Sequence, residues 1–125
     1  MIYKARCIYK TDTKKGGEIM TLEDLKQMPL LQTRTIAEAC KKDERTHKYI
    51  VECLQRFYAG DYGEICAEDT GYNNDDLASG YGHVLARYKG KFALEGDFYI
   101  EAHFDADNLQ DVDYTQIMIM YPSER

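Results

Sequence analysis

Carboxylates gather in one segment, GDYGEICAEDTGYNNDDLASGYG, which covers residues 60–82 and contains no lysine or arginine. Paired catalytic carboxylates, as in a glycosidase, need two acids across a cleft in surroundings that separate their pKa values. This spacing does not indicate such a pair. We expect Asp61 to be structural, as an acceptor for backbone N–H groups in a Gly-Asp-Tyr-Gly turn, and Asp69 or Asn73 to cap a helical turn. The six acids are Asp61, Glu64, Glu68, Asp69, Asp75 and Asp76.

Three residues with metal-binding side chains, Cys40, His47 and Cys53, lie close together in the sequence. On one helix Cys40 and His47 would be about 10.5 Å apart along the axis. Two zinc ligands cannot span that distance, because each must lie about 2.0–2.3 Å from the metal. This trio is therefore excluded as a metal site on a continuous helix.

A second set of residues fits a metal better. If two strands in residues 83–104 form a hairpin, His83 lies opposite His103, and Glu101 shares their face. The two histidines could then bind zinc together with an acid such as Glu101 or with Cys66 from the preceding loop. The alternative is two histidines on a polar sheet face.

Other catalytic and ligand-binding patterns fail. Cys66 lies among acids, which disfavour the thiolate that a catalytic cysteine needs. There is no G-x-S-x-G or phosphate-binding glycine motif. The run DADNLQDVDYTQ lacks the glycine and glutamate of an EF-hand loop. A calcium site of another kind would use Asp105, Asp107, Asp111 and Asp113, although acidic loops are more often simply solvated. We therefore expect no enzymatic activity, and zinc is the one cofactor left open.

The length of 125 residues predicts a single domain over 1–125 with a substantial core. No apolar stretch is long enough to span a membrane, and the first residues, MIYKARCIYK, lack the apolar run of a signal peptide. These features predict a cytoplasmic protein. Its four cysteines would then stay reduced and pack as small apolar side chains.

The charge is divided between the two ends of the chain. Residues 1–56 carry twelve Lys and Arg against eight Asp and Glu, whereas residues 57–125 carry four against fourteen. An acidic half disfavours contact with nucleic acid, whose phosphates need concentrated Lys and Arg. It favours a partner protein with a basic surface, toward which it would be steered.

Periodicity predicts an N-terminal strand over residues 2–10 and a short helix in TLEDLKQM with Thr21 as its N-cap. The clearest helix covers 44–58, because its apolar residues recur at helical spacing. The segment from Thr35 is either a separate helix or the start of one longer, bent helix.

Residues 83–88, 98–104 and 114–121 alternate with period two and predict three strands. Short connections favour an antiparallel meander, in which Phe98, Ile100, Ala102 and Phe104 would face the core. These three strands, the N-terminal strand and the helices predict an α+β fold. Its sheet would have about four mainly antiparallel strands, with helices packed on one face. Residues 114–121 could form an exposed edge and pair in a homodimer, so monomer and homodimer both remain open.

The C-terminal 75 residues resemble a family of short proteins common in phage, plasmid and integrated-element regions of bacteria. The family pattern is a helix ending in G-D-[WY]-G, then E-D, then N, L and G, a strand ending in an aromatic residue, and a final P-x-E. The matching positions are Gly60, Asp61, Tyr62, Gly63, Glu68, Asp69, Asn74, Leu77, Gly80, Tyr88, Pro122 and Glu124. The resemblance implies a mobile genetic element as the source; it implies no chemistry.

Acidic surface and tyrosine content together predict an interaction protein. The chain has eleven tyrosines and no tryptophan, and Tyr62 and Tyr72 lie among the carboxylates. Aromatic anchors in a charged rim are typical of protein interfaces. We expect the six acids, with these two tyrosines, to block a host protein with a basic surface, such as a CRISPR effector or a restriction enzyme. The alternatives are a zinc-binding accessory protein and a module that binds a small ligand or nucleotide.

Overall fold

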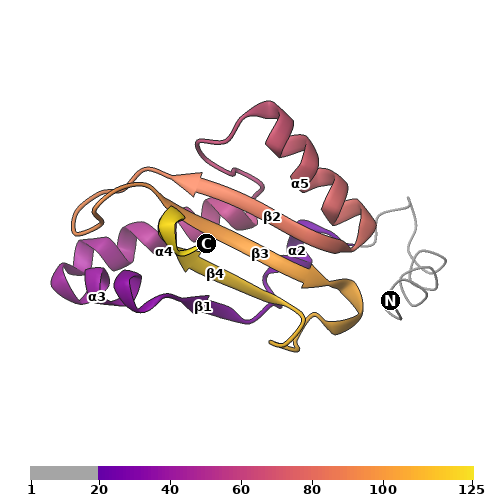
Figure 1. Ribbon diagram of the computed structural model, residues 1–125, viewed down its shortest axis with the longest axis horizontal. Helices are drawn as coiled ribbons and strands as arrows, with labels where there is room; N and C mark the ends of the chain where they lie inside the picture. Colours follow the sequence, from indigo (N-terminus) through magenta and orange to yellow (C-terminus); the bar gives the residue numbers. More distant parts are fainter. Residues whose placement is uncertain (1–19) are drawn as a thin grey trace.

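The computed structural model describes residues 20–125 as an α+β fold with a four-stranded sheet (Figure 1). The strand expected over residues 2–10 lies outside the described residues. The helices are α2 (Leu22–Leu25), α3 (Arg34–Lys42), α4 (Glu44–Tyr58) and α5 (Ala67–Ser79), with 3-10 turns η2 (Ala106–Asn108) and η3 (Pro122–Glu124). The strands are β1 (Leu30–Gln32), β2 (Tyr81–Tyr88), β3 (Phe98–Asp105) and β4 (Gln116–Met120). None of the helices in residues 20–125 is long and apolar enough to cross a membrane.

The strand order is β1-β4-β3-β2, with β2, β3 and β4 antiparallel and β1 parallel to β4. The sheet is mainly antiparallel, as expected, and the strand beyond β4 is the short β1, which was not predicted. The expected free edge at residues 114–121 is wrong, because β4 pairs with a strand on each side. β4 therefore offers no open edge for a dimer.

Residues 34–58 form two helices in succession, α3 and α4. Asp43 has an extended backbone and its side chain accepts a hydrogen bond from the backbone N–H of Arg45, so it caps α4 and separates it from α3. The predicted helix over 44–58 coincides with α4. The short helix after Thr21 is also present, and Thr21 and Asp24 form a capping box.

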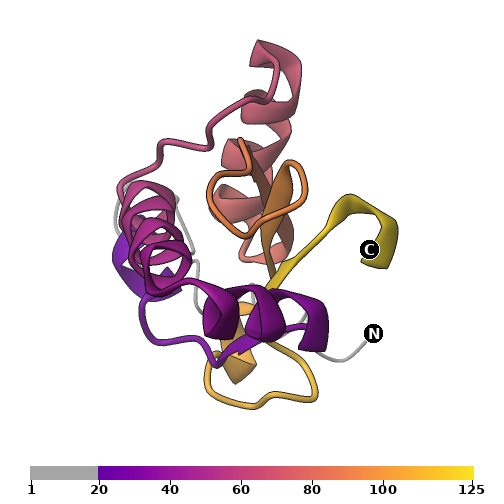
Figure 2. The same ribbon diagram turned by 90° about the vertical axis from the view of Figure 1, so that its left-hand side faces the viewer.

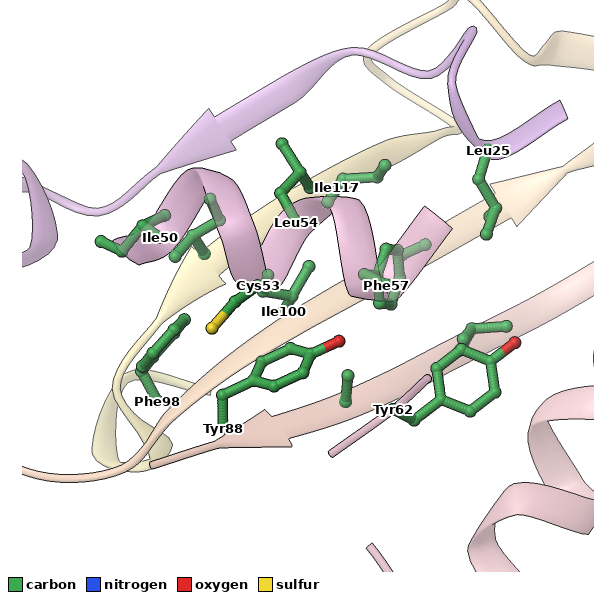
Figure 3. Packing of buried hydrophobic residues seen from close by; sticks show 14 of the residues in the cluster. Leu25, Ile50, Cys53, Leu54, Phe57, Tyr62, Tyr88, Phe98, Ile100 and Ile117 are labelled. Carbon is green, nitrogen blue, oxygen red and sulfur yellow. The ribbon is translucent and has the colours of Figure 1, made fainter. Parts of the chain in front are cut away.

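The core lies between α4 and one face of the sheet (Figure 2). Ile50, Cys53, Leu54 and Phe57 project from α4 toward the strands, where Tyr88, Phe98, Ile100 and Ile117 meet them (Figure 3). The four predicted core residues of β3 are all buried, since alternate residues of a strand face one side. Burying a side chain such as Phe57 stabilises the fold by about 2–3 kcal/mol.

Helix α5 was not predicted, and Asp69 and Asn73 do not cap a turn within it. Both lie inside the helix, which begins after Cys66 and ends at Gly80 in a left-handed conformation. Only Asn73 and Leu77 are buried in this helix, so it lacks the apolar stripe that marks α4. It lies beside β2, at the edge of the sheet (Figures 1 and 2).

Candidate functional site

Helix α5 closes the outer edge of β2 with polar side chains. The Asn73 amide accepts a hydrogen bond from the backbone N–H of Leu85 (3.0 Å) and donates one to its carbonyl (2.9 Å). One turn later, the Asp76 carboxylate accepts from the backbone N–H of His83 (3.0 Å). An edge strand with unpaired backbone groups invites pairing with another chain. Asn73 and Asp76 satisfy those groups and fix α5 against the sheet.

The turn that contains Asp61 continues the same edge. The backbone of Tyr62 accepts from Arg87 N–H (3.0 Å), and Glu64 N–H donates to the Arg87 carbonyl (2.7 Å). Between them, Gly63 has a φ of +73°, and a Cβ there would lie 2.1 Å from the Arg87 carbonyl oxygen. Only glycine fits this close approach.

Asp61 has the structural role expected for it. Its carboxylate accepts hydrogen bonds from Arg56 Nε (2.7 Å) and from the backbone N–H of Gly63 (3.1 Å). The Arg56 guanidinium and then the Gly63 N–H hold the pKa of the Asp61 carboxyl below its usual range. The charge of Asp61 is therefore already paired within the fold.

The predicted partner-binding residues divide into two groups. Tyr62 is only 5% exposed and packs with Phe57, and Asp76 is bound to the β2 backbone. Glu64 lies 3.7 Å from Lys89. The other group remains on the surface of α5 and is called the acidic stripe: Glu68, Asp69, Tyr72 and Asp75.

The acidic stripe follows the helical repeat. Glu68, Tyr72 and Asp75 are spaced i, i+4 and i+7, which places them on one side of α5. Tyr72 is 59% exposed, and its hydroxyl donates to Glu68 (3.4 Å). Within residues 20–125, no lysine, arginine or histidine forms a salt bridge with the three acids. Glu68 and Asp69 in the first turn also interact favourably with the helix dipole.

The hairpin register expected for the two histidines is present. His83 lies directly opposite His103, and their ring centroids are 5.5 Å apart with an interplanar angle of 41°. Both side chains are exposed on the sheet face that points away from α4. The prediction of two adjacent histidines is confirmed.

The other two members of the predicted zinc set do not join them. Cys66 precedes α5, whereas Asp76, near the opposite end of the helix, contacts the backbone of His83. Ten helical residues separate the two ends by about 15 Å. Glu101 forms an ion pair with Arg125 instead. Among residues 20–125, no three His, Cys, Asp or Glu side chains are grouped to hold a metal ion.

Glu101 forms a buried ion pair that the sequence did not indicate. Its side chain is 1% exposed and accepts from Arg125 Nε (3.1 Å) and Nη2 (2.8 Å), while His103 Nε2 lies 3.3 Å away. Burial raises the pKa of the Glu101 carboxyl, but hydrogen bonds with His103 and Arg125 outweigh burial and lower it to about 2. In turn, the carboxylate of Glu101 raises the pKa of His103. No local sequence pattern links Arg125 to a strand 24 residues earlier.

The acidic loop after β3 is organised by its own hydrogen bonds. Asp105 is 2% exposed, and its carboxylate accepts from the backbone N–H of Asp107 and from the Asn108 side chain, both at 3.0 Å. The Asp111 carboxylate accepts from the backbone N–H of Asp113. These contacts are typical of acids that shape turns, and they account for Asp105 without a calcium ion.

The chain matches no protein-family model, no curated protein and no solved structure at a significant level of similarity. The fold and the geometry of individual residues must therefore carry any functional assignment.

Proposed function

We propose that this protein binds a basic surface of a bacterial host protein through the acidic stripe and blocks it. The observation that carries the proposal is the outer surface of α5. It presents three carboxylates around Tyr72, and residues 64–86 contain no Lys or Arg. The helix contributes only Asn73 and Leu77 to the buried interior. Most of its surface is therefore available to a partner.

Electrostatics favour a basic partner. Neighbouring carboxylates on one helix repel one another, and a surface of lysines and arginines would relieve that repulsion. Such charges also steer association, an effect that weakens once salt shortens the screening length. Tyr72 supplies the aromatic contact that charges alone do not provide, because tyrosine is enriched among the residues that contribute most binding energy.

The acidic stripe is held in a fixed position, which lowers the entropic cost of binding. Asn73 and Asp76 attach α5 to β2, and the backbone N–H of Met20 donates to the carbonyl of Leu77 (3.2 Å). The left-handed cap at Gly80 then turns the chain into β2. The acids are therefore presented on a rigid element.

The partner that fits this chemistry is a nucleic-acid enzyme whose phosphate-binding channel is lined by Lys and Arg. Carboxylates that occupy such a channel would compete with phosphates. The family resemblance implies a phage or plasmid source, so the natural targets are CRISPR effectors and restriction enzymes in the bacterial cytoplasm. The protein would act as an anti-defence inhibitor with no catalytic role of its own.

The test is capture of a target from a lysate that contains CRISPR and restriction systems, followed by inhibition of the purified target. We expect one nucleic-acid enzyme to be retained at about 0.1 M salt and released near 1 M. The triple variant Glu68→Gln, Asp69→Asn, Asp75→Asn should weaken binding at least about tenfold, or about 1.4 kcal/mol.

A matched control changes exposed acids elsewhere. Glu52 lies on α4 and Glu95 on the β2–β3 connection, and both are exposed. The double variant Glu52→Gln, Glu95→Gln should bind as the wild type does. The proposal fails if the triple variant folds with an unchanged melting temperature and still inhibits the target fully, or if no nucleic-acid enzyme is retained.

A further inference from the structure

Basic and aromatic side chains meet at a site away from the acidic stripe. A hollow of about 260 Å³ lies between α4 and the β2–β3 connection, residues 89–97. Figure 1 shows this connection at the end of the molecule where α3 is followed by α4. Its lining residues are Arg45, Lys48, Tyr49, Glu52, Lys91 and Phe92. A second hollow of about 190 Å³ shares Tyr49 and Lys91 with it and adds Arg56, Lys89 and Glu64, with Lys89 paired to Glu64 and Arg56 paired to Asp61. We call the two together the basic groove.

The connection that forms one wall of the basic groove is anchored to α4 at two points. The Tyr49 hydroxyl donates to the Lys89 carbonyl (2.5 Å), and the buried Thr46 hydroxyl accepts from the backbone N–H of Ala93 (3.1 Å). Between these anchors, Phe92 has a φ of +59° and is 49% exposed. A left-handed conformation is unfavourable for a bulky residue and persists only where the surroundings impose it. The anchors therefore hold an aromatic ring at the surface.

Cations surround the two aromatic rings. The Arg45 guanidinium lies 4.8 Å from the Phe92 ring centroid, and the Lys91 ammonium lies 4.9 Å from that of Tyr49. Within residues 20–125, neither Lys48 nor Lys91 forms a salt bridge. Arg45 also pairs with Asp43, yet its side chain remains 67% exposed. The ammonium groups of Lys48 and Lys91 are therefore available to an anionic ligand.

We propose that the basic groove binds a nucleotide unit, with the base stacked on Phe92 and the phosphate held by Lys48 and Lys91. Base stacking on an aromatic ring does not depend on sequence, and a lysine ammonium binds phosphate as a point charge. A free nucleotide and a single strand of nucleic acid share this chemistry. This proposal differs from the expectation of no nucleic-acid contact, which rested on net charge: Lys48 lies on α4 and Lys91 on the β2–β3 connection, whereas the acidic stripe lies on α5.

The primary test is fluorescence anisotropy of a labelled ten-residue oligothymidylate titrated with the full-length protein. We expect Lys48→Glu to raise the Kd at least about tenfold, and Phe92→Asn to raise it about fivefold. Asparagine tolerates the left-handed conformation, so Phe92→Asn should fold normally. The slope of log K against log salt should be near −0.7, which corresponds to the one phosphate that Lys48 and Lys91 hold. Arg34→Glu at the start of α3 is the matched charge control and should change the Kd less than twofold.

Competition separates the two sources of the nucleotide. Displacement of the oligonucleotide by adenosine monophosphate would assign the site to a free nucleotide; displacement only by unlabelled oligonucleotide would assign it to a strand. Equal displacement by inorganic phosphate would overturn the role of Phe92. The proposal also fails if neither probe binds at about 0.1 mM protein, or if Lys48→Glu and Phe92→Asn bind as the wild type does. Because the acidic stripe is not part of this site, the triple stripe variant should bind the oligonucleotide at least as well as the wild type.

Discussion

The Glu101 carboxylate and the Arg125 guanidinium form a two-point ion pair, with Nη2 2.8 Å and Nε 3.1 Å from the carboxylate oxygens. The end marked C lies on the side of the sheet away from α4 (Figure 2), and the pair ties Arg125 to the centre of β3. Glu101 is 1% exposed, so its charge is stable there only because Arg125 and His103 accompany it. Arg125 is therefore part of the folded structure.

Acid should weaken the fold through Glu101. Its pKa is about 2 in the folded protein, below the usual 4.5, so ionisation contributes stability that is present above about pH 4.5 and lost as the pH falls toward 2. The full contribution corresponds to about 3 kcal/mol. Urea unfolding at several pH values should show the wild type losing its advantage over Glu101→Gln across this window. A difference in unfolding free energy that stays constant from pH 6 to 2 would contradict this role.

The stability that the protonation of His103 contributes should change with pH in the opposite sense. Glu101 raises its folded pKa above the usual 6.5, so the pair contributes stability that is complete below about pH 6.5 and lost as the pH rises through the folded pKa. An NMR titration should place the midpoint of His103 above 6.5, and Glu101→Gln should lower it. Glu95→Gln, in the β2–β3 connection, should leave the midpoint unchanged. The same midpoint in the wild type and Glu101→Gln would show that Glu101 does not act on His103.

Asn73 should contribute far more to the stability of the fold than its neighbour Asn74. Replacing it with alanine leaves the N–H and carbonyl of Leu85 without their partner, at a cost of about 3 kcal/mol. Asn74→Ala is the matched control, because Asn74 is exposed on the same helix and should change stability by less than about 0.5 kcal/mol. Chemical denaturation measures both values. Similar denaturation curves for the two variants would mean that water replaces the Asn73 amide at little cost in free energy.

Replacing two glycines near the acidic stripe with alanine should change the stability of the fold in opposite directions. Gly63→Ala would place a methyl group against the Arg87 carbonyl in a backbone conformation that disfavours it, with an expected loss of about 3 kcal/mol or more. Gly71 lies within α5, and a Cβ there would meet no atom within 4 Å. Gly71→Ala should therefore stabilise the protein by about 0.5–1 kcal/mol. Thermal unfolding of both variants checks the pair, and a stabilised Gly63→Ala would refute the close approach.

Local patterns in the sequence were sufficient for several elements. The apolar spacing in residues 44–58 predicted α4 with its observed bounds, and alternation in β3 identified its buried face. The His83–His103 register, which was assumed for a hairpin of these two strands, is also present. These features depend on which side of each segment is buried, and residues two to four positions apart already record that choice.

Only the tertiary structure decided the remaining features, because each depends on groups that meet after folding. The sequence of α5 shows little apolar periodicity, because polar side chains rather than apolar ones attach this helix to the backbone of β2. β1 is three residues long and exists through its parallel pairing with β4. Arg125 reaches Glu101, and Lys48 meets Phe92 at the basic groove, across distances in sequence that no short-range periodicity spans. Sequence alone thus determined where the chain is amphipathic, and folding determined which charges became neighbours.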